Sequence, residues 1–372
     1  MQVLDGATVK PILAGAKRGF WMRIAIAAAL AGLLAAGAAQ AFPSADKQVK
    51  DWDAVCDNSG ACAAFGFTPD DGTTPAFVRV TRAAGPAAAP SVEITYDSGD
   101  TQPAGQQWTL NIDGNAVAGV GTLTAKGGDD GARVTLTTVQ AAALIDAIRG
   151  GQRLDLMQAG KSLATISLAG SAAVLLWVDA DQGRAGTVTA MVGKGAGPAA
   201  SVPPPATVPV VSAAAPVSQA GLPKLAPPGL IKGIPDCDMA FNPVPTPDDI
   251  VARLAPGVVL WGPECDMAAY NEISVFFLGD EHGGHIQPLK LPDFTGATLA
   301  PNGAIELVNA GFDPKTQTLS AFDKGRGIGD CGSTASWVWD GKAFQLLGET
   351  LMSDCHMVTT DDWPTLYVAR QK

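Results

Sequence analysis

The stretch Lys324-Gly-Arg-Gly-Ile-Gly-Asp-Cys-Gly332, with the Trp337-Val-Trp-Asp-Gly-Lys-Ala-Phe344 that follows it, is the most informative part of this chain. The second segment is typical of two strands joined by a turn at Asp340-Gly341. A dinucleotide-binding loop leads into a helix, and a P-loop ends in Gly-Lys-Ser/Thr, so neither fits a glycine-rich loop between strands. We therefore expect the glycines to allow positive φ and close backbone approach beside a disulfide.

A second interpretation of the same stretch is a ligand-binding loop in which Arg326 contacts an anion. Lys324, Asp330, Trp337 and Trp339 complete this candidate ligand-binding set. Tryptophans can stack on sugars, yet in short strands they more often fill a core. The sequence predicts no cofactor.

The first 41 residues have the features of a secretory signal peptide. Basic residues between 17 and 23 precede an apolar run at 24–39, and Ala39-Gln40-Ala41 supplies a cleavage site. The run is short of the roughly 20 residues that cross a bilayer, although a retained anchor is the rival interpretation. Met1 and Met22 are both candidate starts. We expect a periplasmic protein with no membrane span left after cleavage.

Six cysteines follow the leader, and an even number in an exported chain is typical of disulfides. Fifteen pairings are possible, and the sequence alone does not choose among them. Local closure favours three bridges, each between neighbouring cysteines in the chain. These bridges are Cys56–Cys62, Cys237–Cys265 and Cys331–Cys355.

Acidic residues outnumber basic ones by 36 to 25, which gives the chain a net charge of −11. Nucleic-acid phosphates and anionic lipid surfaces would repel such a chain, so we expect neither as a partner. An envelope protein or a glycan remains a candidate partner. Carboxylates are too frequent in so acidic a chain for any one pair to indicate a glycosidase.

The proline-rich stretch at 194–229 has only Lys194 and Lys224 as charged residues. Such a composition favours an extended, semi-rigid spacer with no core of its own. The sequence therefore predicts an N-terminal domain at 46–193 and a C-terminal domain at 230–372, each stapled by disulfides.

The N-terminal domain is predicted as α+β, with an antiparallel sheet and two helices. Thr138 is expected to cap a helix at 139–149 that ends at Gly150-Gly151, and a second helix is expected at 168–180. Alternating apolar and polar residues predict the strands. They cover 62–67, 77–82, 91–96, 108–112 and 134–136.

The C-terminal domain is predicted as a mostly antiparallel β meander. One short helix is expected at 246–254, because Thr246-Pro247-Asp248 combines a capping hydroxyl, a first-turn proline and an acid. Turn residues separate the predicted strands. These lie at 258–261, 273–278, 305–308, 318–322, 336–339, 343–347 and 366–369.

Two of the three histidines, His282 and His285, lie beside Asp280 and Glu281 and form the candidate metal site. The glycines between them argue against a rigid cage, and a polar hairpin tip is the alternative. Asp179-x-Asp181-x-Gly183 is similar to a calcium loop but lacks the full EF-hand spacing.

The chain resembles an uncharacterised family of bacterial exported proteins with six recurrent cysteines. The matching features are Asp51-Trp52 with Cys56-Asp57-Asn58, then Asp236-Cys237-Asp238, and the stretch 324–332. This resemblance implies periplasmic residence and cysteine pairing, and no catalytic activity. The N-terminal half is also similar to the invasion-associated locus B proteins, through its tryptophan–cysteine opening and Asp179-Ala-Asp-Gln-Gly-Arg184, which implies an envelope role.

The sequence favours a non-catalytic periplasmic binding or interaction protein of the cell envelope. An envelope hydrolase that uses acids and a metal near His282 and His285 is the second hypothesis. A structural envelope stress-tolerance factor is the third. The prediction leans against an enzyme, because no Gly-x-Ser-x-Gly motif occurs and the cysteines are assigned to bridges.

Overall fold

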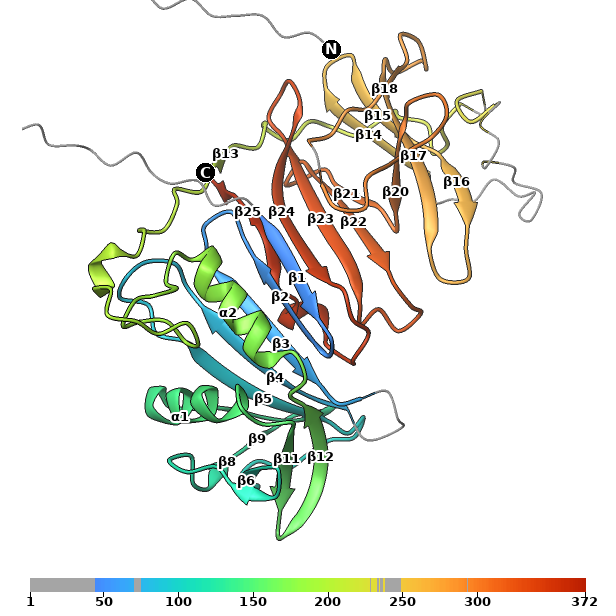
Figure 1. Ribbon diagram of the computed structural model, residues 1–372. Helices are drawn as coiled ribbons and strands as arrows, with labels where there is room; N and C mark the ends of the chain where they lie inside the picture. The colour runs from blue at the N-terminus through green and yellow to red at the C-terminus, as the bar shows by residue number, and fades with distance from the viewer. Residues whose placement is uncertain are drawn as a thin grey trace, which may run out of the picture. The chain divides into compact units, whose positions relative to one another are not determined.

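Figure 1 shows a computed structural model of the chain. The part that the structure describes is mostly β, with antiparallel sheets, two α-helices and three disulfides. No helix in this part is long and apolar enough to cross a membrane. The predicted signal peptide, residues 1–41, lies outside it. The described residues are 44–69, 75–227, 229–232, 234, 237, 249–292 and 294–372.

The first sheet has the strand order β1-β2-β3-β4-β5-β10-β9, and all neighbours are antiparallel (Figure 1). Because side chains alternate along a strand, successive residues point to opposite faces of this sheet. Val78 and Ile94 face the core that the sheet shares with both helices, whereas Phe77, Arg79 and Thr95 lie on the opposite face, which we call the outer face. The strands are β1 (Ala45–Val49), β2 (Trp52–Cys56), β3 (Cys62–Phe67), β4 (Ala76–Arg82), β5 (Ser91–Asp97), β9 (Lys126–Gly127) and β10 (Gly131–Thr135).

A second antiparallel sheet, of order β12-β11-β6-β7 with β8 also paired to β6, belongs to the same half of the chain. Trp108 on β6 is fully buried in the core of the first sheet. Strands β11 and β12 were not predicted from the sequence. The strands are β6 (Gln107–Ile112), β7 (Asn115–Ala116), β8 (Leu123–Thr124), β11 (Arg153–Gln158) and β12 (Lys161–Ser167).

Helix α1 (Thr138–Ile148) packs Leu144 into the core of the first sheet. Thr137 caps this helix, not Thr138 as predicted. Thr137 is extended, and it forms a capping box in which its side chain and that of Gln140 satisfy each other's backbone N–H groups. Thr138 already has a helical position, so it has no capping role.

Helix α2 (Ser171–Asp181) begins three residues after the predicted start at Leu168, because Gly170 has a φ of 101°. A Cβ atom on Gly170 would lie 1.9 Å from the carbonyl oxygen of Val49. The chain turns where only glycine fits, and the helix starts after the turn. Val174 is fully buried in the core, as its predicted position on the buried side requires.

The second half of the chain contains two further antiparallel sheets, β14-β15-β17-β20-β19 and β21-β22-β23-β24-β25 (Figure 1). β16 and β18 also pair with β17. The predicted antiparallel β architecture is therefore confirmed. The strands are β14 (Ile250–Ala255), β15 (Val258–Gly262), β16 (Glu264–Met267), β17 (Glu272–Gly279), β18 (Gln287–Pro288), β19 (Thr298–Leu299), β20 (Ile305–Val308), β21 (Gly311–Asp313), β22 (Thr318–Lys324), β23 (Gly332–Trp339), β24 (Phe344–Met352) and β25 (Thr365–Val368).

The predicted helix at 246–254 is wrong for residues 250–254, which belong to strand β14; residues 246–248 lie outside the described part. β14 pairs antiparallel with β15. Ala252 and Leu254 alternate into the core, as strand residues do. The capping signal at Thr246 is local, and the tertiary pairing with β15 overrides it.

The proline-rich stretch 194–229 is in contact with both halves of the chain. Within it, β13 (Val210–Val211) pairs in parallel with β26 (Arg370–Gln371). The backbone N–H of Ala206 donates to the carbonyl oxygen of Ser59 at 3.1 Å. The division of the chain into two domains stays a prediction.

The outer face of the first sheet packs against the second half of the chain. Phe67 and Phe77 belong to one buried cluster with Trp363. The Asn58 side chain donates to the carbonyl oxygen of Val368 at 3.0 Å and accepts its N–H at 2.8 Å. The outer face of the first sheet and residues 357–362 of the second half enclose one cavity, which is described below.

Candidate functional site

The glycine-rich loop at 324–332 has the structural role that its strand context indicates. The N–H of Gly325 donates to the carbonyl oxygen of Cys331 at 2.8 Å, and a Cβ atom on Gly325 would lie 2.7 Å from Cys331 Sγ. Gly332 has a φ of 128°, a conformation that a residue with a Cβ atom rarely adopts. The glycines thus permit close backbone approach beside a disulfide. The three disulfides are Cys56–Cys62, Cys237–Cys265 and Cys331–Cys355, the pairs that local closure favours.

Arg326 is engaged within the loop. Its Nε lies 2.7 Å from Asp330 Oδ1, in a two-pronged ion pair. Asp330 is 5% exposed and also accepts the backbone N–H of Met357 at 2.6 Å. Burial raises the pKa of Asp330, but the hydrogen bonds from Arg326 and Met357 outweigh it, so this pKa lies below its usual value. The Lys324 ammonium lies over the ring of Phe322. The loop therefore anchors the segment around Met357.

The two tryptophans of the candidate ligand-binding set fill the core. Trp337 is fully buried and Trp339 is 3% exposed. Their rings pack against Phe294 and Phe344 respectively. Neither indole presents a face to a ligand, so the structure does not bring them together with Arg326 in a binding site.

The two candidate metal ligands lie in the loop between β17 and β18. His285 Nδ1 is 2.9 Å from Asp280 Oδ2, and the backbone N–H of His282 donates to the other carboxylate oxygen. The hydrogen bond from His285, with two from backbone N–H groups, lowers the pKa of Asp280 to about 2. Among the described residues, neither histidine belongs to a cluster of three groups that could hold a metal. His356, the third histidine, stacks on Phe67, at 4.3 Å between ring centroids.

Asp179, the first acid of the calcium-like sequence, is fully buried and fully used by the protein. Its carboxylate accepts the backbone N–H groups of Met191 at 2.8 Å, Val192 at 2.7 Å and Gly193 at 3.1 Å. The Arg82 guanidinium lies 3.9 Å away. With its oxygens occupied in this way, Asp179 organises the chain after α2 and is not available to bind calcium.

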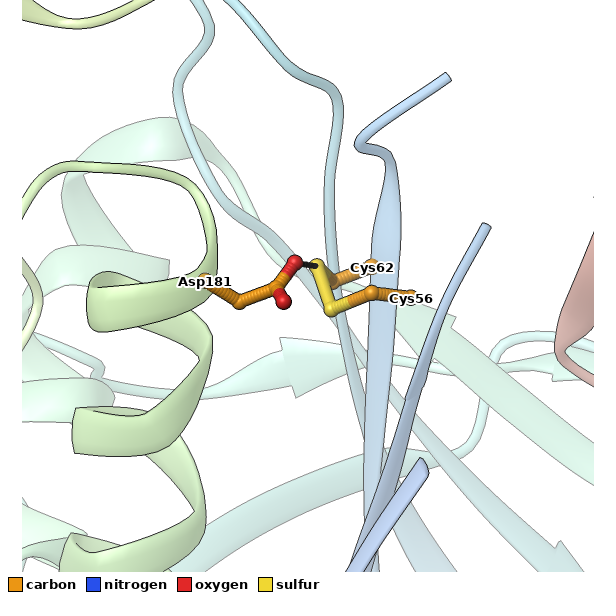
Figure 2. A group of neighbouring side chains, drawn as sticks. All are labelled: Cys56, Cys62 and Asp181. Atoms are coloured by element: carbon orange, nitrogen blue, oxygen red, sulfur yellow. Dashed lines mark hydrogen bonds between the residues drawn. A yellow bond between two sulfur atoms is a disulfide. The ribbon is translucent and has the colours of Figure 1, made fainter. Parts of the chain in front are cut away.

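Asp181, the second acid of that sequence, points at the first disulfide (Figure 2). Its Oδ2 lies 4.0 Å from Cys62 Sγ, and Cys56 completes the group. The thiolate, not the disulfide, is the sulfur ligand of metals, so the oxidised group is not a metal site. Burial raises the pKa of Asp181. Asp330 and the Cys331–Cys355 disulfide form a second such group, which is not a metal site for the same reason.

A cavity of about 330 Å³ opens between the outer face of the first sheet and residues 357–362, and we call it the β5–β10 cavity. This volume is at the lower end of the range for small-molecule sites. Thr95 and Asp97 on β5 and Arg133 on β10 form one wall together with the β9–β10 turn. Residues Met357, Thr359 and Asp362 form the other.

An ion-pair network ties the two walls together. Arg79 lies 2.7 Å from Asp362 and 2.8 Å from Glu93. Arg133 lies 3.3 Å from Asp362 and 3.8 Å from Glu93. Two arginines and two acids therefore balance one another, and Asp362, in a short 3₁₀ turn (Thr360–Asp362), is held against the sheet.

Among the described residues, one polar group at the cavity wall lacks a hydrogen-bond partner and another lacks a countercharge. Thr95 is 9% exposed, and its hydroxyl makes no hydrogen bond. Asp97 is half-buried; it accepts a hydrogen bond from the Gly99 N–H but makes no ion pair in the described part of the chain. Burial raises the pKa of Asp97, with a further contribution from the charges of Asp130 and Asp330.

Sequence reasoning missed the β5–β10 cavity. The available signal was the turn Lys126-Gly-Gly-Asp-Asp-Gly131, which places acids beside glycines. Gly131 is required there, since a Cβ atom would lie 2.1 Å from the carbonyl oxygen of Tyr96. The other wall comes from residues 357–362, far away in the sequence, so no local pattern joins them.

The fold and its bridges define a β-rich protein stapled by three disulfides. The chain belongs to the family described as "Protein of unknown function (DUF1176)", which matches residues 46–370. It is 31% identical over 233 residues to "Uncharacterized protein YpfG" of Escherichia coli (strain K12). That alignment covers 58% of this chain and 65% of the relative, which is less than two thirds of the relative's length. No solved structure matches the chain.

These comparisons support the resemblance to an uncharacterised protein family. They do not support the predicted similarity of the N-terminal half to the invasion-associated locus B proteins. In this structure, residues behind that similarity stabilise the fold through hydrogen bonds. Gln182 and Arg184, in the sequence that begins at Asp179, donate to backbone carbonyls of the first half, including those of Gly60 and Gly85.

Removal of the Cys331–Cys355 bridge is expected to lower the free energy of unfolding by roughly 2–4 kcal/mol, because the bridge restricts the unfolded chain. The variant is Cys331→Ser/Cys355→Ser, measured by urea unfolding. Cys56→Ser/Cys62→Ser is the matched comparison: its bridge spans 6 residues against 24, so its loss should be smaller. A double variant at 331 and 355 as stable as the native chain would contradict this role.

Proposed function

We propose that this chain is a non-catalytic, exported binding protein of the cell envelope, and that it holds its ligand in the β5–β10 cavity. The observation that carries the proposal is the Thr95 hydroxyl, which is buried at the cavity wall without a hydrogen bond. Leaving such a group unsatisfied costs roughly 1–3 kcal/mol. Local costs of this kind are expected at functional sites, where a ligand supplies the missing partner.

Two further features support the proposal. Three disulfides are typical of proteins that fold in an oxidising compartment such as the bacterial periplasm. The far wall of the cavity is fixed by the Cys331–Cys355 bridge, by the hydrogen bond from Met357 to Asp330, and by the ion pairs of Asp362. A preformed wall reduces the entropy that a ligand must offset on binding.

Substitution Thr95→Val is expected to raise the free energy of unfolding by about 1 kcal/mol, since it removes an unsatisfied buried hydroxyl and keeps the shape of the side chain. It is also expected to remove ligand binding. Thermal unfolding of the native chain and the variant is compared with and without 1,5-diaminopentane, glutarate or N-acetylglucosamine. At least one of these is expected to raise the unfolding temperature of the native chain only.

The control for this experiment is Thr109→Val, the same change at an exposed position on β6 away from the cavity. Its stability is expected to change by less than about 0.5 kcal/mol, with the ligand response retained. The proposal fails if the ligand response of Thr95→Val equals that of Thr109→Val, or if none of the three compounds stabilises the native chain.

A further inference from the structure

The charges around the β5–β10 cavity do not cancel. Arg79 and Arg133 are matched by Glu93 and Asp362, as described above. The remaining charged residues of the lining are Asp97, Asp129 and Asp130 on one side and Lys126 on the other. None of these four makes an ion pair with another residue in the described part of the chain. The cavity therefore keeps an excess of negative charge.

The acceptors of the cavity lie on one strand face. Thr95 and Asp97 are two residues apart on β5, so their side chains leave the sheet on the same side. The Thr95 hydroxyl is unpartnered and closed to solvent, so a ligand would meet it after rotation of this side chain toward the cavity; Asp97 uses one oxygen for the Gly99 N–H, which leaves the other. Asp130 adds a third acceptor at the exposed rim. An acidic wall with an unfilled hydroxyl beside it suits a ligand that donates several hydrogen bonds and carries positive charge.

We propose that the β5–β10 cavity binds its ligand through a primary ammonium group, which donates to Asp97 and Thr95 and lies in the field of Asp130. The proposal rests on the proposed function, because it names the chemistry of the same site. An ammonium group has three donors and no acceptor, which matches a wall of unfilled acceptors. Its hydrogen bonds to a carboxylate are of the stronger, charge-assisted kind.

A divalent metal ion fits this wall less well. Ca²⁺ takes 6–8 oxygen ligands at short distances, and Mg²⁺ requires near-octahedral geometry. In the described part of the chain, no three acidic side chains of the cavity bring one oxygen each to within 4.8 Å of one another. An anionic ligand would meet Asp97, Asp129 and Asp130, with Lys126 as the one unmatched cation of the lining. The ammonium group is the class that the geometry favours.

The test is calorimetric titration of the full mature chain with 1,5-diaminopentane, with its neutral N,N′-diacetyl derivative, and with glutarate. Only the diamine is expected to bind. A tripeptide with acetylated and amidated ends, Gly-Lys-Gly, forms a further arm. Tighter binding of the tripeptide identifies a lysine side chain of a partner as the source of the ammonium, and tighter binding of the diamine identifies a free small amine.

Asp97→Asn is expected to weaken diamine binding at least tenfold, because it replaces a charge-assisted pair with a neutral one. Asp100→Asn is the matched control, since Asp100 is exposed, lies three residues away and does not line the cavity. It changes the net charge equally and should leave binding within about twofold. Thermal unfolding of both variants confirms that they fold.

The outcomes separate the two proposals. The ammonium inference is overturned if the diacetyl derivative or glutarate binds as tightly as the diamine. If that binding is also lost in Thr95→Val, the binding function still stands. Diamine binding that is unaffected by both Asp97→Asn and Thr95→Val places the ligand elsewhere on the surface and overturns the inference. Absence of binding by all compounds at millimolar concentration overturns both proposals.

Discussion

Substitution Asp179→Ala is expected to lower the free energy of unfolding by roughly 3–5 kcal/mol, the range for breaking a buried charged network. The change leaves three backbone N–H groups at residues 191–193 without their acceptor. It also leaves the buried guanidinium of Arg82 without its nearest countercharge. Since small domains are stable by only about 5–15 kcal/mol, a loss of this size is a large fraction of the total. Urea unfolding measures it.

Asp181→Ala is the matched control, because Asp181 lies on the same helix, whereas the three N–H groups all donate to Asp179. Burial disfavours its charged form, so its loss is expected to change stability by less than about 1 kcal/mol. A calcium site would give a different result. The two substitutions would then be equally damaging, and a chelator would lower the unfolding temperature of the native chain.

Substitution Asp53→Asn is expected to stabilise the protein at pH 8.5, relative to its effect at pH 5, by roughly 4 kcal/mol. Asp53 on β2 is 2% exposed, and neither carboxylate oxygen meets a hydrogen-bond partner in another residue. Burial, together with the charges of Asp354 and Asp46, raises its pKa from 3.8 to about 8. The folded protein must therefore either keep a proton on this group or bury a charge at high pH.

The sign of the pH dependence follows from the two pKa values. Between pH 4 and pH 8 the folded state holds a proton on Asp53 that the unfolded state has released, so the stability due to this group falls as the pH rises. The slope approaches about 1.4 kcal/mol per pH unit. In Asp53→Asn this slope is absent, so the advantage of the variant over the native chain should shrink as the pH is lowered toward 4.

Urea unfolding at pH 5 and pH 8.5 measures the difference, with Asp100→Asn as an exposed acid that loses the same charge. The control should be equally stable relative to the native chain at both pH values. If the difference between Asp53→Asn and the native chain does not grow with pH, Asp53 titrates in the folded protein as an ordinary exposed acid.

Local patterns in the sequence were sufficient for most strands of the second half. The strand predicted at 273–278 lies within β17, and the one at 318–322 lies within β22. Short apolar runs between turn residues mark these segments, and β17 buries residues on both of its faces, so the signal is local and visible in the sequence. The nearest-neighbour disulfides were likewise favoured, since short loops close most easily.

Other features depended on residues that are distant along the chain. Strand β14 was mistaken for a helix, because its partner β15 outweighs the capping signal at Thr246. Trp337 and Trp339 were placed in a candidate binding set, yet the sheets cover both indoles. A residue type is compatible with a core and with a site, and burial decides between them.

The sequence by itself determined the acidic charge, the six cysteines, the predicted leader and the antiparallel β character, since each depends on composition or on the spacing of near neighbours. The tertiary structure alone decided that Thr95 and Asp97 face a cavity closed by residues 357–362, and that Asp179 is a buried acceptor rather than a metal ligand. The physical reason is that burial and partners belong to surfaces brought together by folding. The same residue type can therefore fill a core at one position and line a cavity at another.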